Sequence, residues 1–402
     1  MRQAFKKLGP GLLFAGAAIG VSHLVQSTRA GADFGFGLVW ALVLINLIKY
    51  PFFQFGPRYA LATGESLLDG YKRLGKGVLL VYYVLNLGTM FTIQAAVTSV
   101  TAGIVARMLG ISSSAWISVF VALLCFAVLW RGKYGWLDKS MKVIVVLLSI
   151  STVLAVVFAF VQKPDISWAQ VLPVKADEWI FLIAFMGWMP GPMDISIWHS
   201  LWALEKKKLQ PETTIKNTLF DFNTGYVVTL LLGVCFIVLG ASVLYQSEVS
   251  LSTNGAAFAG QLIGVYTSLM GNGWFVIIAI AAMATMFSTT ITTLDASPRV
   301  MAHTTKLLNG KYGNTQQSWL VVLTLGTCAI FLFFASEMGL LVQIATVLSF
   351  LTAPFYAAAN LRLVTGKHMP KEHRPKKGLQ LVGVLGLLFL ITFGIAYLLV
   401  VF

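Results

Sequence analysis

The sequence predicts an all-α membrane protein with eleven transmembrane helices. Of its 402 residues, 57% are hydrophobic and 11% are charged, and the mean hydropathy is +0.81. Apolar runs recur along the whole length, and most approach the roughly 20 residues that a helix needs to cross a bilayer core. No soluble domain or long linker is visible between them. We therefore expect the whole chain, 1–402, to form one transmembrane domain.

The predicted spans follow from the length and composition of these apolar runs. A long connection, 245–272, carries no Lys or Arg and is expected to lie outside the cell with a short helix. The spans lie at about 10–33, 36–59, 78–109, 115–129, 141–161, 179–204, 219–244, 273–302, 320–336, 340–363 and 379–400.

Basic residues gather in alternate connections, and this accounts for the formal net charge of +14. One group is Arg2, Lys6 and Lys7, and another is Lys206 to Lys208. This positive-inside pattern predicts a cytoplasmic (inner) membrane protein with its N-terminus inside and, after eleven crossings, its C-terminus outside. The charge therefore indicates topology, and we expect the lipid bilayer, not nucleic acid, as a partner.

The sixth span is interrupted by a run with two prolines around a glycine. Proline lacks an N–H and clashes with the preceding turn, so a helix cannot continue through it. Backbone freed in this way survives in a membrane only where it lines a cavity or is buried in protein. A broken helix with an ionisable residue indicates a transporter's binding site, although a proline kink with a capping Asp is the simpler alternative. The expected substrate-binding residues here are Met189, Pro190, Gly191, Pro192, Met193 and Asp194.

The first span has a weaker candidate break. Glycine costs about 1 kcal/mol in a helix interior relative to alanine, so Gly16 and Gly20 favour an interruption near mid-membrane. The alternative is an unbroken helix made smooth for close packing by its small residues. The expected substrate-binding residues at this break are Gly20, Val21, Ser22 and His23.

Pairing the two spans favours a break in both. They open two sets of five helices, and five crossings reverse the starting side, so the sets have opposite orientation. Inverted repeats of this kind hold the site at their interface. We expect a first repeat at about 10–161, a second at about 179–363, and an extra helix at about 379–400.

Several short stretches carry a resemblance to a known family. They are Gly9-Pro10-Gly11, Ala30-Gly31-Ala32-Asp33-Phe34-Gly35, Arg58-Tyr59 with Ala62-Thr63-Gly64, His199-Ser200, and Ser288-Thr289-Thr290-Ile291-Thr292. Together they resemble the Nramp family of divalent-metal transporters. The resemblance covers spans one to ten and implies the LeuT-like fold, with two inverted five-helix repeats plus an eleventh transmembrane helix.

The family's functional motifs are changed in this chain. Where the family's first helix carries Asp-Pro-Gly-Asn, this sequence reads Gly20-Val21-Ser22-His23. The family's Met-Pro-His corresponds to Pro192-Met193-Asp194, or, with a gap, to Met189-Pro190. The third span lacks the family's proton-carrying acids and has Gln94 near their place. The resemblance thus points to Gln94 and His199 for gating or a proton path.

These changes favour a small inorganic anion such as bicarbonate as the transported species. Half-helix N-termini attract anions, and Ser22 and His23 add donors. Arg29, nearer the outer mouth, either draws in anions or pairs with Asp33. An anion needs a driving Na⁺ or H⁺. The expected coupling-ion residues are Ala17, Ser288, Thr289, Thr292 and Asp194, although the hydroxyls can instead bond their own helix.

Metal uptake is the alternative. His23 and Asp194 could hold a divalent cation of the Mn, Fe or Mg type with H⁺ coupling, unless His23 is only a hydrogen-bonded interior residue.

A channel or receptor without coupled transport is a third class of function. Nothing indicates an enzyme, because the glycine-rich stretches are membrane helices and not phosphate cradles. We expect a monomer with no cofactor beyond a coupling Na⁺. Lys49 should snorkel or pair with an acid, while Asp221 and Asp295 should be solvated.

Overall fold

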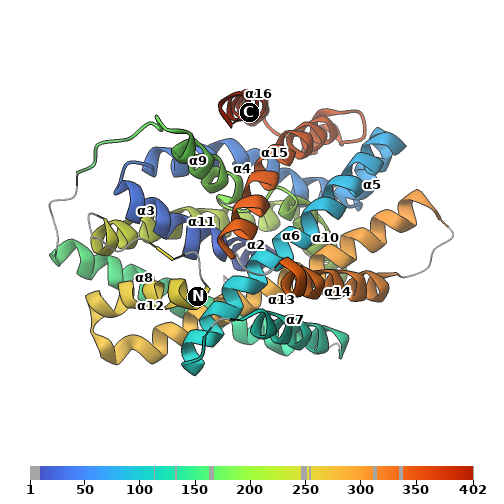
Figure 1. The fold of residues 1–402 in the computed structure, drawn as a ribbon. Coiled ribbons are helices and arrows are strands. Elements are labelled where there is room, and N and C mark those ends of the chain that lie inside the picture. The colour runs from blue at the N-terminus through green and yellow to red at the C-terminus, as the bar shows by residue number, and fades with distance from the viewer. Residues whose placement is uncertain are drawn as a thin grey trace.

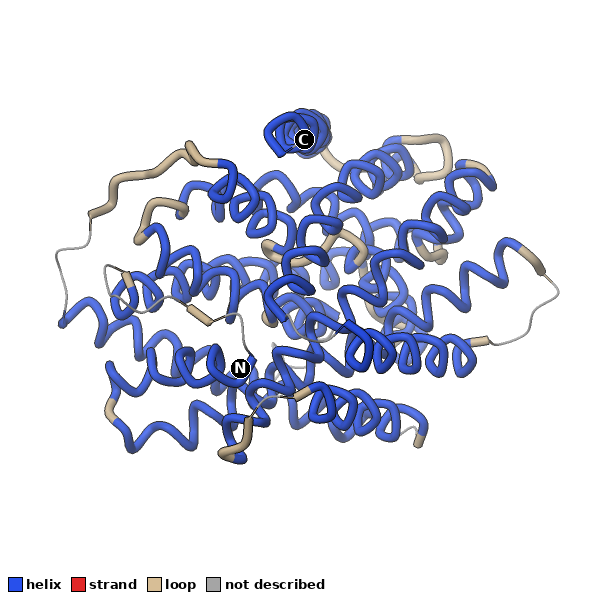
Figure 2. Tube along the Cα trace, viewed as in Figure 1, coloured by secondary structure: helices blue, strands red, loops and turns tan. Residues whose placement is uncertain are grey.

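The computed structural model describes residues 10–112, 114–131, 134–162, 167–245, 251–252, 255–310, 315–334 and 338–401. Gly9, Ser336 and the basic residues Arg2, Lys6 and Lys7 lie outside these ranges. Within them the chain is a bundle of helices joined by loops, with no strand (Figure 2).

Seven helices of the described residues are long and apolar enough to cross a membrane. They coincide with the second, third and seventh to eleventh predicted spans. The last, α16, lies at the edge of the bundle (Figure 1), as expected for a helix outside the repeats. The seven are α4 (Val39–Thr63), α6 (Lys76–Leu109), α11 (Ile215–Leu244), α13 (Phe275–Leu308), α14 (Gln316–Phe334), α15 (Met338–Thr365) and α16 (Lys377–Val401).

The four remaining predicted spans are also helical, and two of them are broken. The fourth and fifth are α7 (Ala115–Trp130) and α8 (Tyr134–Gln162), and the first and sixth are each divided in two. The expected short helix between the seventh and eighth spans is α12 (Gly255–Met270). The predicted crossings therefore each have a counterpart in the structure.

The first span is interrupted where the glycines predict it. Its first half is α2 (Pro10–Ala18), and after Ile19 and Gly20 the chain continues as a π-helix, η1 (Ser22–Ser27), and then α3 (Thr28–Phe34). A Cβ added to Gly20 would lie 2.8 Å from the Thr289 methyl group, so glycine lets the break approach α13 closely.

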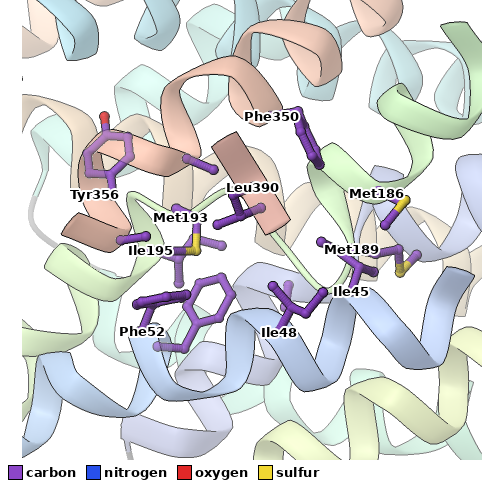
Figure 3. Packing of buried hydrophobic residues seen from close by; sticks show 14 of the residues in the cluster. Ile45, Ile48, Phe52, Met186, Met189, Met193, Ile195, Phe350, Tyr356 and Leu390 are labelled. Atoms are coloured by element: carbon purple, nitrogen blue, oxygen red, sulfur yellow. The ribbon is translucent and has the colours of Figure 1, made fainter. Parts of the chain in front are cut away.

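The sixth span is divided into α9 (Ala176–Trp188) and α10 (Ile195–Leu209) by the proline run. Asp194 stands at the N-cap position of α10, but its side chain makes no capping hydrogen bond. Figure 3 shows how Met189 and Met193 of the run lie among apolar side chains, with Phe52 of α4 and Phe350 of α15 nearby. The break is thus buried in protein and not exposed to lipid.

Small residues of the first span also allow close packing, since a Cβ on Gly11 would lie 2.2 Å from the Asp221 carbonyl oxygen. A Cβ on Gly31 would overlap the carbonyl oxygen of Ile237, and a Cβ on Gly240 would overlap that of Thr28. These glycines let α3 and α11 approach backbone to backbone. The first span is therefore both broken and closely packed.

Asp221 corrects one expectation, because it is fully buried and not solvated. Its Oδ2 accepts a hydrogen bond from the Gly11 backbone N–H at 3.0 Å and lies 3.6 Å from Lys206 Nζ. This carboxylate on α11 therefore joins the start of α2 to the end of α10. Asp295 is only partly exposed and pairs with Arg299 one turn later on α13.

Replacing Gly31 with alanine should destabilise the protein by about 1–3 kcal/mol, because the added methyl group meets a backbone atom that cannot rotate away. Gly16→Ala is the matched control, since a Cβ there meets nothing within 4 Å. Thermal unfolding in detergent measures both. Equal midpoints for the two variants would contradict this packing.

Candidate functional site

A small cavity lies between the two breaks. It is lined by Ala17, Ala18 and Ser22 of the first span, by Trp188, Pro192, Ile195 and Trp198 of the sixth, by Ile93 and Val97 of α6, and by Thr289 and Thr293 of α13. Its volume of about 20 Å³ is close to that needed for a single water. The repeat interface is thus occluded in this structure, and the cavity is the candidate substrate site.

His23 is held by hydrogen bonds on both sides of its ring. Nδ1 lies 2.8 Å from Ser22 Oγ and 3.1 Å from the Ala18 carbonyl, while Nε2 lies 2.9 Å from the Thr229 carbonyl of α11. The ring is completely buried. Of the two readings of this histidine, the geometry matches the hydrogen-bonded interior residue, because neither nitrogen is free for a metal.

Lys49 supplies a buried positive charge that sequence analysis did not assign to the site. From α4, its Nζ donates to the carbonyls of Met186 at 2.8 Å and Gly187 at 2.6 Å, and reaches that of Gly191 at 3.5 Å. These carbonyls belong to the last turn of α9 and to the break itself. A cation at a helix C-terminus is stabilised by the helix dipole. Lys49 therefore caps α9 instead of snorkelling to the surface.

Two polar atoms at the break and in the first turn of α10 have no hydrogen-bond partner among the described residues. Asp194 is 4% exposed, and its Oδ1 is unpaired. Asp194 lies within electrostatic range of Lys49. Trp198 lines the central cavity, and its indole Nε1–H is buried and unpaired. An indole N–H can only donate, so this position favours a ligand that accepts hydrogen bonds.

The α13 hydroxyls are divided between the cavity and their own helix. Thr289 Oγ1 donates to Thr285 O at 3.1 Å and approaches the Gly16 carbonyl at 3.4 Å. Of the predicted coupling-ion residues, Ala17 and Thr289 line the cavity, whereas Ser288, Thr292 and Asp194 do not. Thr293, which sequence analysis missed, lines it too and donates to Gln94 Oε1 at 2.7 Å. Gln94 thus joins α6 to α13.

His199 is buried among aromatic rings and does not line the central cavity. Its ring is 5.8 Å from that of Phe14 and 5.5 Å from that of Phe222, measured between centroids. Neither ring nitrogen has a partner in the described part of the chain. The structure therefore provides no hydrogen-bonded chain through His199, and its role in a proton path stays a prediction.

Larger cavities lie on either side of the central one. On the predicted outer side, a cavity of about 170 Å³ is lined by residues of η1, α3, α9, α12 and α15. On the predicted cytoplasmic side, a cavity of about 350 Å³ lies between α10, α13 and a short helix, α5 (Leu67–Leu74), that the sequence analysis did not predict.

Asp69 lines this inner cavity. Burial raises the pKa of its carboxyl group, but hydrogen bonds with His303 and Ser66 have the larger combined effect and lower the pKa to about 2.

The described residues contain no group of three or more His, Cys, Asp and Glu side chains placed to hold a metal ion. The two candidates, His23 and Asp194, do not share a ligand position in this conformation, because His23 is bonded to Thr229 and Ser22. Two carbonyl oxygens beside the sixth-span break, those of Met186 and Gly187, are already bonded to Lys49.

Two interrupted helices that meet at an occluded cavity inside a membrane bundle define the class of the protein as a transporter. A family model described as "Natural resistance-associated macrophage protein-like" (Nramp) matches residues 11–401. The chain belongs to the Nramp family. An uncharacterized protein of Pasteurella multocida (strain Pm70) is 35% identical over 98% of this chain and 92% of that protein.

Solved structures agree on the fold. A mutant of the Eremococcus coleocola manganese transporter superimposes with a TM-score of 0.72 at 12% identity, covering 96% of this chain and 85% of that one. Mhp1, a nucleobase-cation-symport-1 family transporter, superimposes with a TM-score of 0.56 at 14% identity, covering 98% and 92%. The fold is therefore LeuT-like, as predicted, and the protein is a multi-pass membrane transporter.

Lys49→Met should lower the free energy of unfolding by about 3–5 kcal/mol, because it leaves the α9 carbonyls and the Asp194 charge without compensation. Asp194→Asn should recover part of this loss in the double variant, since the two charges interact. Thermal unfolding of the four proteins in detergent measures the coupling. Strictly additive shifts in midpoint would show that the two charges are independent.

Proposed function

We propose that this protein is a secondary transporter that moves a small inorganic anion, such as bicarbonate, together with Na⁺ or H⁺. The observation that carries this proposal is the set of polar atoms left unpaired at the centre. Two carbonyls at the end of α9 are occupied by Lys49, while Trp198 lines the cavity and its indole Nε1–H, a pure donor, is unpaired. The free donor suits an anion, while the unpaired acceptor, Asp194 Oδ1, is left for a coupling cation.

The charge of Lys49 at the sixth-span break also favours an anion over a divalent metal ion. Two unit charges 4 Å apart interact by about 4 kcal/mol at the effective dielectric of a protein interior, and the energy doubles for a divalent ion. A metal ion at the α9 carbonyls would therefore be repelled by the Lys49 ammonium and would also have to displace it. An anion near the same ammonium would be attracted by it, with the Asp194 charge opposing this attraction unless a coupling Na⁺ or H⁺ neutralises it.

Coupling to a cation follows from the membrane potential. One negative charge moving into a cell that is negative inside works against about 2.3 kcal/mol per 100 mV. The unpaired Asp194 Oδ1 is the candidate coupling atom, either as a Na⁺ ligand or as a proton carrier. Thr289, near the first-span carbonyls, is a second candidate for Na⁺.

H⁺-coupled uptake of a divalent metal of the Mn, Fe or Mg type is the second candidate function, and membership of the Nramp family favours it at least as strongly. The solved relatives include a manganese transporter. In this chain the Met189 thioether lies 3.9 Å from Ser27 Oγ, so a soft ligand of the sixth span faces the first span. Metal binding would require His23 to leave Thr229 or Lys49 to leave α9.

Proteoliposome flux separates the two functions. We expect labelled bicarbonate to accumulate under an inward Na⁺ or H⁺ gradient, with no manganese or magnesium signal from a trapped dye. Asp194→Asn should abolish the gradient dependence, whereas Asp295→Asn should reduce it less, because Asp295 pairs with Arg299 away from the break. Metal flux without anion flux would refute the proposal.

Trp198→Phe should raise the KM for bicarbonate about tenfold or more, because a hydrogen bond to a charged ligand contributes about 1.5–3 kcal/mol. Trp179→Phe serves as the control, since Trp179 packs against Phe393 of α16 and does not line the central cavity. Initial uptake rates over a range of external bicarbonate concentrations give the KM of each variant. An unchanged KM in Trp198→Phe would remove the indole from the site.

A further inference from the structure

We propose that the outer cavity is a second binding site, in which Arg29 and Gln26 hold the anion before it reaches the central cavity. This inference rests on the proposed function and adds to it a site on the predicted outer side. The cavity has a volume of about 170 Å³, compared with about 20 Å³ at the centre. It therefore has room for a small oxyanion where the occluded central cavity has none.

Gln26 is the first residue that points to a ligand. It lines the outer cavity, is only 2% exposed, and its Oε1 has no partner in the described part of the chain. A buried amide oxygen without a hydrogen bond is costly, and native structures pair such atoms with protein or with a bound molecule. Gln26 also lies on the π-helix η1, and π-helical turns occur frequently at functional sites.

Arg29 is the second residue that points to a ligand in the outer cavity. Its guanidinium lies 5.5 Å from the centre of the Phe181 ring, so the side chain is held against the wall of the same cavity. The salt bridges of the described residues do not include Arg29, although Asp33 is within electrostatic range. Its Nε–H is buried and unpaired. The surface pairing with Asp33 is thus not a direct ion pair, and a donor remains for an anion.

The position of the pair connects the two sites. Gln26 and Arg29 are four and seven residues after Ser22, which lines the central cavity. At helical rise, seven residues span about 10 Å. An anion at the outer site would therefore lie about two helical turns from the central one, along the same broken span.

The unpaired atoms also define the class of anion. Arg29 offers a charged donor, and Gln26 offers an acceptor. Bicarbonate has oxygens for the first and an O–H for the second, whereas nitrate has no donor. Asp177 lines the same cavity from the first turn of α9 and is exposed. Its negative charge opposes an anion there, so it should weaken binding.

The test uses the full chain in proteoliposomes and measures initial rates of labelled bicarbonate uptake. Arg29→Gln should raise the KM about tenfold while leaving the maximal rate within about twofold, because the outer site delivers the anion and does not carry the transport step. Arg29→Lys should recover part of the affinity, since it keeps the charge. Asp177→Asn should lower the KM, because it removes the opposing charge.

Gln26→Leu tests the ligand class. Competition by external nitrate should be weak in the unaltered protein and stronger in this variant, because the acceptor that selects an O–H is lost. If Arg29→Gln fails to fold, the Asp177→Asn result decides, since that side chain is exposed. An unchanged KM in both charge variants overturns the outer site while leaving anion transport intact. No bicarbonate uptake by the unaltered protein overturns the proposed function, and this inference with it.

Discussion

The contact between the Lys49 ammonium and the end of α9 is the interaction on which the centre of this molecule depends. A broken helix leaves its last carbonyls without intrahelical partners, and a bilayer offers no water to replace them. Lys49 satisfies two of these carbonyls and approaches one in the break. In exchange, the carbonyls and the nearby Asp194 compensate a charge that would be very costly to bury alone.

The first break is stabilised in a corresponding way. His23 reaches from the first span to the Thr229 carbonyl of α11, just as Lys49 reaches from α4 to the sixth span. In the inverted-repeat scheme α4 and α11 are the second helices of the two repeats. Each break is therefore held by the second helix of the opposite repeat, through a basic side chain or ring and a backbone carbonyl. These two polar contacts add to the close glycine packing between the repeats.

Local chemistry explains why the spans and both breaks could be predicted from the sequence. Proline and glycine act on the backbone near their own position, and a span must match the bilayer wherever its partners lie. Side-chain partners follow no such local rule. A lysine inside an apolar span shows that compensation exists, but not that it comes from carbonyls more than 130 residues away.

The same limit applies to the candidate site. The sequence offered two readings of His23, and only the packing of Thr229 against it distinguishes them. Thr293 and Trp198 were missed because threonine and tryptophan are common in membrane helices and carry no distinguishing spacing. Asp221 was expected in solvent because it lies near a helix end, yet the approach of α2 buries it. Each difference arises from tertiary packing.

The position of Asp221 has a mechanical consequence. One carboxylate holds the amide at the start of α2 and the ammonium at the end of α10. These are the halves of the two interrupted spans on the predicted cytoplasmic side. If either half swings away, the shared anchor loses a partner that water must replace. Opening toward the cell interior therefore requires water to reach this buried carboxylate.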